Sequence, residues 1–243
     1  MSSKTLPPEK ESYLQHRLGR LKDRLENHLR YVQSPISLYY KLKASAATPK
    51  LLDNPEILQA RRVAGQYAEG HSFGKYSKID QYIPFNLRRV YALGLHKSPP
   101  LRVLDLGAGV GFFLYLSKLH GHTAIGIDSQ DDDFYTQMYR AFNVQCSQCT
   151  IMPNTLLPDF GQKFDLVTAF AICFHAIDGY NWTADDWRFF VQDIIDHHCV
   201  SGGRIHLHFH DDPRGSREDA RRKIRQNFPL AVNEFQAIVI PVP

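Results

Sequence analysis

A glycine-rich segment, Val103 to Gly111, reads Val-Leu-Asp-Leu-Gly-Ala-Gly-Val-Gly at the end of a predicted buried strand over 101–106. Glycines at a strand-to-helix turn let the backbone approach a ligand at the carboxyl edge of a parallel sheet. The spacing is not the dinucleotide fingerprint Gly-x-Gly-x-x-Gly, because the third glycine comes one residue early. A phosphate-binding loop is excluded as well, since no Gly-Lys-Ser/Thr is present.

Two acidic residues flank this loop. Asp105 stands two residues before Gly107, and no Lys or Arg occurs from 103 to 117. This pattern favours a ligand with cationic groups over a pyrophosphate. Asp128 ends the next predicted strand, where an acid can accept hydrogen bonds from both hydroxyls of a ribose.

Histidines gather around the fourth and fifth predicted strands. His175 follows the fourth strand, and a histidine pKa of ~6.5 suits removal of a proton at neutral pH. A structural hydrogen bond in a loop is the alternative role. His206, His208 and His210 share one face of the next strand. Residues spread along one strand do not converge readily on an ion, so we predict no metal site, and His210 is a second candidate to reach a substrate.

Two further motifs are predicted to be structural. Cys146-x-x-Cys149 has no second pair, whereas zinc usually takes four ligands. A basic helix over 214–225 could meet phosphate backbones, but it lacks interleaved aromatic residues, which favours a solvated face.

The elements that position these residues alternate between strand and helix from residue 101 onward. This alternation predicts an α/β fold with a doubly wound, mostly parallel sheet. Strands are predicted over 101–106, 123–128, 144–151, 164–170, 204–209 and 236–240, and helices over 10–33, 36–42, 55–70, 84–95, 111–120, 132–142, 183–200 and 216–227.

The chain divides into three predicted parts. Residues 1–66 form an N-terminal helical extension, 67–100 a lid with its lead-in helix, and 101–243 the core. A leucine stripe over 10–33 can pack on its own chain or on a second copy, which would form a homodimer. The N-terminal helices are expected to cap the site and select the acceptor.

Composition limits the class of protein. Of 243 residues, 43% are hydrophobic and 22% charged, as in ordinary globular proteins. No apolar run approaches the ~20 residues of a membrane helix, and the polar start is no secretory signal, so we expect a cytoplasmic protein. The first 100 residues hold 17 basic and 8 acidic residues, against 12 and 17 in the rest. The basic charges are spread out, which favours solvated helix faces over a nucleic-acid surface.

Together these motifs resemble the class I S-adenosylmethionine (SAM)-dependent methyltransferases. The resemblance runs from about residue 67 to 240. Within the family, residues 182–203 look like a group of uncharacterised bacterial enzymes, which implies no particular acceptor. The likeness rests on Val-Leu-Asp-Leu-Gly-Ala-Gly-Val-Gly from Val103, Gly-Ile-Asp from Gly126, Phe-Asp-Leu-Val from Phe164 and Ser-Gly-Gly-Arg-Ile from Ser201.

The resemblance implies a Rossmann-like methyltransferase sheet that binds SAM. Asp105 would lie near the cofactor ammonium, Asp128 would hold the ribose, and Lys75 in the lid would pair with the carboxylate. The acid that usually binds adenine is missing from 150–158, so we expect a backbone contact near Ile151. The cofactor-binding residues implied in this way are Lys75, Tyr76, Asp105, Gly107, Ala108, Gly109, Asp128, Ser129, Ile151 and Phe170.

We therefore expect a methyltransferase that acts on oxygen or nitrogen of a small or medium-sized acceptor. Catalysis would rest on alignment in a dry pocket, with at most one general base, His175 or His210. The fourth strand lacks the Asn/Asp-Pro-Pro-aromatic motif of enzymes that methylate exocyclic amines of bases. Two alternatives remain open, an RNA or other nucleic-acid methyltransferase and a non-catalytic SAM-binding interaction protein.

Overall fold

The computed structural model of this chain describes residues 35–67, 74–130, 132–172, 174–177, 180–209, 217–234 and 237–243. The helix predicted over 10–33, residues 68–73 of the lid, and His210 lie outside these ranges. No helix in the described part is long and apolar enough to cross a bilayer.

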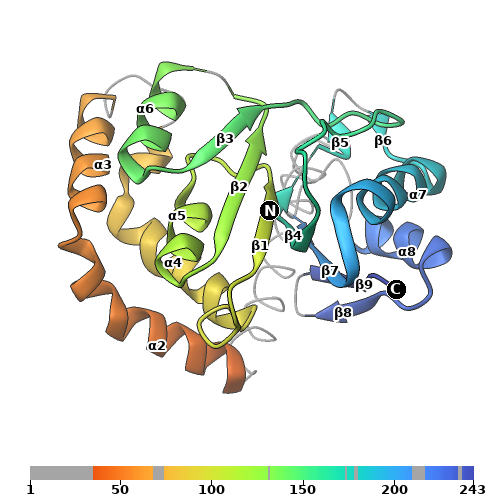
Figure 1. Cartoon of the computed structure of the whole chain (residues 1–243), viewed down its shortest axis with the longest axis horizontal. Helices are drawn as coiled ribbons and strands as arrows, with labels where there is room; N and C mark the ends of the chain where they lie inside the picture. Colours follow the sequence, from red (N-terminus) through yellow and green to blue (C-terminus); the bar gives the residue numbers. More distant parts are fainter. Residues whose placement is uncertain are drawn as a thin grey trace, which may run out of the picture.

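A seven-stranded sheet forms the centre of the molecule (Figure 1), in the order β3-β2-β1-β4-β7-β9-β8. All neighbours pair in parallel except β9, which is antiparallel to β7 and β8. The strand order reverses direction between β1 and β4, and such a switch point is where open α/β sheets bind ligands. The predicted doubly wound, mostly parallel sheet is therefore confirmed. The strands are β1 Arg102–Leu106, β2 Thr123–Asp128, β3 Gln145–Gln148, β4 Phe164–Ile172, β7 Cys199–Phe209, β8 Val232–Glu234 and β9 Ala237–Pro241, with a small hairpin of β5 Ala176–Ile177 and β6 Tyr180–Asn181.

Helices cover both faces of this sheet. Alternate residues of the central strands feed two hydrophobic cores, because successive side chains of a strand point to opposite faces. Val103 belongs to the core under α2 to α6, and its neighbour Leu104 belongs to the core under α7 and α8. The helices are α2 Pro35–Leu52, α3 Pro55–Gln66, η1 Gly74–Ser77, α4 Ile79–Ala92, α5 Phe112–Leu119, α6 Asp133–Phe142, α7 Ala184–Asp193, the π-helical turn η2 Ile194–His198, and α8 Arg217–Asn227.

Some predicted boundaries are wrong. Helix α4 begins five residues before Pro84, because Ile79 and Ile83 are buried on its inner face and extend it upstream. Strand β7 begins at Cys199, upstream of the predicted start at residue 204, but its pairing with β4 shifts register between Cys199 and Arg204, so residues 201–203 form a bulge in the strand. A Cβ at Gly203 would lie 2.6 Å from Sγ of Cys199, so this strand requires a glycine there.

The division into extension, lid and core stays a prediction. Helices α2 and α3 from the extension, α4 from the lid segment, and α5 and α6 all contribute to one hydrophobic core. The parts that precede the sheet in sequence are thus packed onto one of its faces.

Strand β2 and the glycine-rich turn approach each other closely at Gly126, and a substitution there tests whether stability depends on this close approach. A Cβ at Gly126 would lie 2.7 Å from Cβ of Ala108 and 2.9 Å from Cδ1 of Leu114. Gly126→Ala should lower the free energy of unfolding by ~1–3 kcal/mol, as overpacking does. Gly65→Ala is the matched control, because Gly65 lies in α3 with open space around it, and it should leave stability unchanged or raise it by up to ~1 kcal/mol. Urea unfolding of both variants measures this, and equal stabilities would contradict the prediction.

Candidate active site

The glycine loop after β1 folds back onto the end of β2. Gly107, Gly109 and Gly111 have φ angles of 77°, 56° and 87°, a region that side chains rarely adopt. The N–H groups of Gly107 and Ala108 both donate to the carbonyl oxygen of Ile127, at 2.8 and 2.9 Å. The predicted strand–turn–helix motif therefore lies at the switch point of the sheet.

Asp128 lies against this loop at the end of β2. Its Oδ2 accepts from the Gly109 N–H at 2.8 Å, and its Oδ1 accepts from the Gln130 N–H at 3.1 Å. A carboxylate has about four acceptor sites, so further lone pairs remain for the two hydroxyls of a ribose. Ser129, the next residue, is exposed at the same edge.

Asp105 lies inside the sheet and is only 2% exposed. The Thr168 hydroxyl on β4 donates to its Oδ1 at 2.7 Å. Burial raises the pKa of Asp105 to about 7, against the Thr168 hydrogen bond and the nearby Arg89 cation, which lower it. Near neutral pH this carboxyl is poised between its two forms, and a cationic ligand beside it would favour the ionised one.

The lid segment reaches the glycine loop through Tyr76. The Tyr76 hydroxyl lies 3.4 Å from the position that a Cβ on Gly109 would take. Tyr139 on α6 meets the same glycine and donates to its carbonyl oxygen at 2.8 Å. Lys75 lies beside Tyr76 in η1, but its side chain is outside the described part, so its pairing with a carboxylate stays a prediction.

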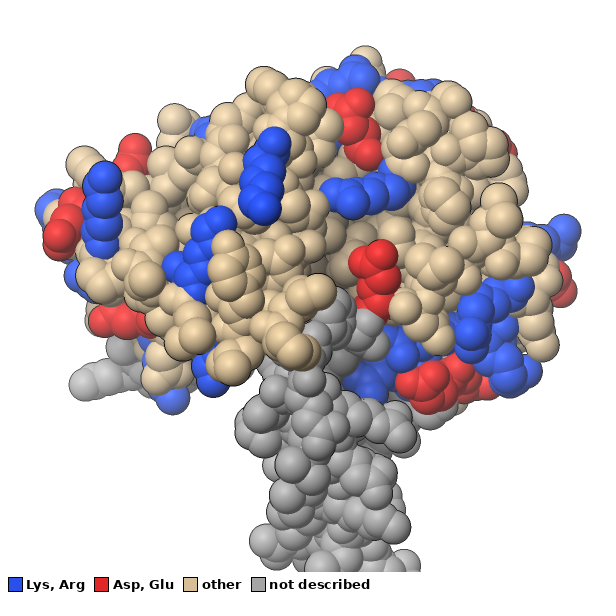
Figure 2. Space-filling view, turned by 90° about the horizontal axis from the view of Figure 1, so that it is seen from below, with Lys and Arg blue, Asp and Glu red and all other residues tan. Residues whose placement is uncertain are grey.

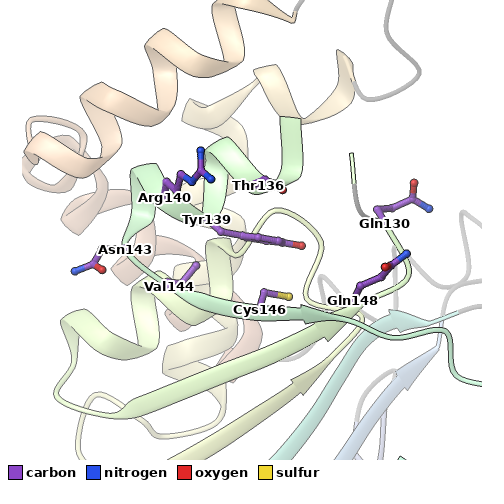
Figure 3. A pocket seen from close by; sticks show the side chains of 8 residues that line it. All are labelled: Gln130, Thr136, Tyr139, Arg140, Asn143, Val144, Cys146 and Gln148. Carbon is purple, nitrogen blue, oxygen red and sulfur yellow. The ribbon is translucent and has the colours of Figure 1, made fainter. Parts of the chain in front are cut away.

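A pocket of about 390 Å³ opens between α6 and β3 (Figure 3). Gln130 lies two residues after Asp128, and Gln148 ends β3, so both amides lie at the carboxyl edge of the sheet. Burial raises the pKa of Cys146 in its wall to about 12, which keeps this thiol neutral. No motif in the sequence pointed to these two glutamines. Ile151, its candidate at this edge, is buried with 7% of its surface exposed.

A second cavity, of about 160 Å³, lies between α2, α4 and the sheet. Phe170, predicted as a cofactor-binding residue, lines this cavity from β4. The register of the strands brings the cavity close to Asp105, because Asp105 pairs with Thr168 and Thr168 with His206. The other lining residues include Tyr40, Phe85, Arg88, Arg89 and His208.

His175 lies elsewhere, in an aromatic cluster under α7. Its ring centroid is 5.5 Å from those of Trp187 and Phe209, and 3% of its surface is exposed. These two rings belong to the core on the opposite face from Phe170. The described residues therefore do not bring His175 together with Phe170, and its role as a general base stays a prediction, as does that of His210.

His206 and His208 line the second cavity from β7. The shared face was visible in the sequence, but only the register with Thr168 and Phe170 reveals their position beside the site. The Ala171 N–H donates to Nδ1 of His208 at 3.2 Å. Among the described residues, no three His, Cys, Asp or Glu side chains are arranged to hold a metal ion.

The sequence matches no known family model and no curated protein. Similar solved structures include a ribosomal protein L11 methylase from Lactobacillus delbrueckii subsp. bulgaricus, at 19% identity over 63% of this chain and 75% of that chain, with a TM-score of 0.42. A TehB-like SAM-dependent methyltransferase from Corynebacterium glutamicum is 15% identical over 67% and 97%, with a TM-score of 0.42. A 16S rRNA N2 methyltransferase from T. thermophilus, in complex with AdoMet and guanosine, is 19% identical over 63% and 38%, with a TM-score of 0.39.

Ionisation of Asp105 should weaken the ligand-free protein. The pKa of Asp105 is about 7 in the folded state, against the ordinary value of 3.8 that applies to the unfolded chain. The free energy of unfolding therefore falls as the pH rises from about 4 through 7. Asn cannot ionise, and Asp105→Asn should therefore gain stability relative to wild type between pH 5 and pH 8. Urea unfolding of both proteins at the two pH values measures this. A difference between variant and wild type that stays constant with pH would contradict the raised pKa.

Proposed function

We propose that this chain is a class I SAM-dependent methyltransferase. The observation that carries the proposal is the glycine loop at the switch point of the sheet, with Asp128 hydrogen-bonded to the loop and Asp105 buried beneath it. Two acids flank a loop that itself contains no Lys or Arg, and this combination suits a ligand that joins a ribose to cationic groups.

The residues at this edge fit SAM group by group. Asp105 would face the ammonium, the backbone of Gly107 to Gly109 the methionine part, and Asp128 the ribose hydroxyls. Gln130 and Gln148 would offer amides to the adenine, in place of the acid that this chain lacks. Lys75 and Tyr76 would close the lid over the carboxylate. When bound, SAM supplies an electrophilic methyl group on a sulfonium.

The acceptor is proposed to be a small or medium-sized molecule methylated on oxygen or nitrogen. This chain would contribute alignment of the acceptor in a pocket that excludes water, which can supply several kcal/mol of the barrier reduction. The proposal includes at most one general base, His175 or His210. It also includes a cytoplasmic location and pairing of two copies through the helix predicted over 10–33.

An RNA methyltransferase is the second candidate, because the first 100 residues are basic. Yet on the face shown in Figure 2, Lys and Arg side chains are interspersed with Asp and Glu. Two cations of the basic helix α8 form hydrogen bonds within the protein. Lys223 donates to the Trp182 carbonyl at 2.8 Å, and Arg221 donates to the Ala237 carbonyl at 3.2 Å. These contacts favour a small acceptor over a phosphate backbone.

Loss of the Asp128 carboxylate should weaken cofactor binding. Calorimetry should detect SAM binding to wild type, and Asp128→Ala should lower the binding free energy by ~1.5–3 kcal/mol, as expected for hydrogen bonds to a charged acceptor. Asp185→Ala, at an exposed position on α7, is the matched control and should bind SAM as wild type does. Binding of NAD in place of SAM by wild type would refute the proposed function.

Removal of His175 tests the general base. Incubation with methyl-labelled SAM and cell extract, separated into small molecules, lipid, protein and RNA, identifies the fraction that accepts the label. If His175 takes the proton, His175→Ala should lower transfer by ~100-fold or more at neutral pH, and higher pH should partly restore it. SAM affinity should hardly change.

The same experiment separates the alternatives. Label in the RNA fraction would support the nucleic-acid candidate, and no transfer despite tight SAM binding would support a non-catalytic role.

Because His175 is packed among aromatic rings, the free energy of unfolding of His175→Ala and His175→Gln must be measured beside turnover. Turnover equal to wild type in a folded variant would assign His175 to packing alone.

A further inference from the structure

The cavity between α4 and the sheet lies next to the proposed cofactor site. A polar row of Asp105, Thr168 and His206 crosses β1, β4 and β7 in register on the face covered by α4. Arg89 lines the cavity and is near enough to Asp105 to influence its ionisation. Of this polar row, His206 lines the cavity itself, so the cavity lies beside the polar row.

The size of the cavity limits its occupant. An engineered cavity of ~150 Å³ holds one benzene molecule, and this one measures about 160 Å³. It can enclose a single six-membered ring with small substituents. Phe85, Phe170 and Tyr40 line it, and aromatic walls favour a planar ring through offset or edge-to-face contact.

One wall of the cavity carries a guanidinium held in place by its neighbours. The Arg89 guanidinium carbon lies 4.2 Å from the ring centroid of Phe170 and 4.4 Å from that of Phe85. Its Nη1 donates to Oδ1 of Asn86 at 2.7 Å. A guanidinium fixed in this way loses little further freedom when its N–H groups bind a carboxylate.

When Arg89 is counted, the arginines among the described lining residues of the cavity outnumber the acids. Arg88 is a second cation on α4, and Glu234 on β8 is the one acid among the lining residues that the structure describes. Burial lowers the pKa of His206 to about 3, so its ring is neutral, and its buried Nδ1 has no hydrogen-bond partner among the described residues. A neutral imidazole can bind a polar substituent without adding charge.

We infer that this cavity binds a planar, single-ring acid, with its carboxylate on Arg89 and a polar substituent on His206. The acceptor role of this molecule rests on the proposed function, whereas its binding does not. A nucleobase would also fit by size, but it lacks the anionic group that Arg89 is placed to recognise.

Binding of benzoate tests the inference in the full chain. Calorimetry should show benzoate binding at least ten-fold more tightly than its neutral analogue benzamide. Arg89→Gln should remove this preference, while Arg62→Gln, an exposed arginine on α3, should keep it. Ala92→Phe fills the cavity from an exposed helix position and should weaken benzoate binding ten-fold or more, which tests the site even if Arg89→Gln fails to fold.

Equal affinity for benzoate and benzamide, no benzoate binding, or binding unaffected by Ala92→Phe would each overturn the inference. Displacement of benzoate by uridine at lower concentration would assign the cavity to a nucleobase instead. SAM titrated into the same protein separates the two proposals: SAM binding without benzoate binding refutes only the cavity, and benzoate binding without SAM binding refutes only the methyltransferase.

Discussion

The carbonyl oxygen of Ile127 accepts hydrogen bonds from the N–H groups of Gly107 and Ala108, and this contact ties the glycine loop to the end of β2. The contact requires a positive φ at Gly107 and the absence of a side chain at Gly126, where a Cβ would meet that of Ala108. The same close approach lets the loop donate to the Asp128 carboxylate. The path of the loop and the position of the acid proposed to hold a ribose are therefore set by one constraint.

Near this loop, the sheet buries the polar side chains of Asp105 and Thr168 and partly buries that of His206. These are interior positions of a kind that apolar side chains usually occupy. Burial of a polar group costs free energy unless hydrogen bonds compensate, and the Thr168 hydroxyl compensates only part of this cost for Asp105. The environment disfavours charge on both Asp105 and His206, since it raises the pKa of the first and lowers that of the second. Strongly perturbed groups of this kind cluster at functional sites, because ligands can offset the cost.

The parts of the site that follow from local sequence were predictable, and the parts that follow from packing were not. The strand, the glycine turn and the positions of Asp105 and Asp128 are read from one short stretch and the strand after it. The position of His175 depends on how the turn after β4 packs against Trp187, a contact between segments that sequence spacing does not relate. The start of β7 was missed because the bulge at residues 201–203 interrupts its pairing with β4 and brings Gly203 back against Cys199.

The cavity illustrates the same limit. Its walls come from Tyr40 on α2, Arg89 on α4, Phe170 on β4 and His206 on β7, segments that only the tertiary fold unites. The glycine loop contributes none of the described lining residues. Substitutions on α2 and α4 can therefore alter the shape and charge of the cavity while the hydrogen bonds between the loop and β2 stay intact. Under the proposed function, such a division would let the helices that precede the sheet select the acceptor while the sheet edge holds the proposed cofactor.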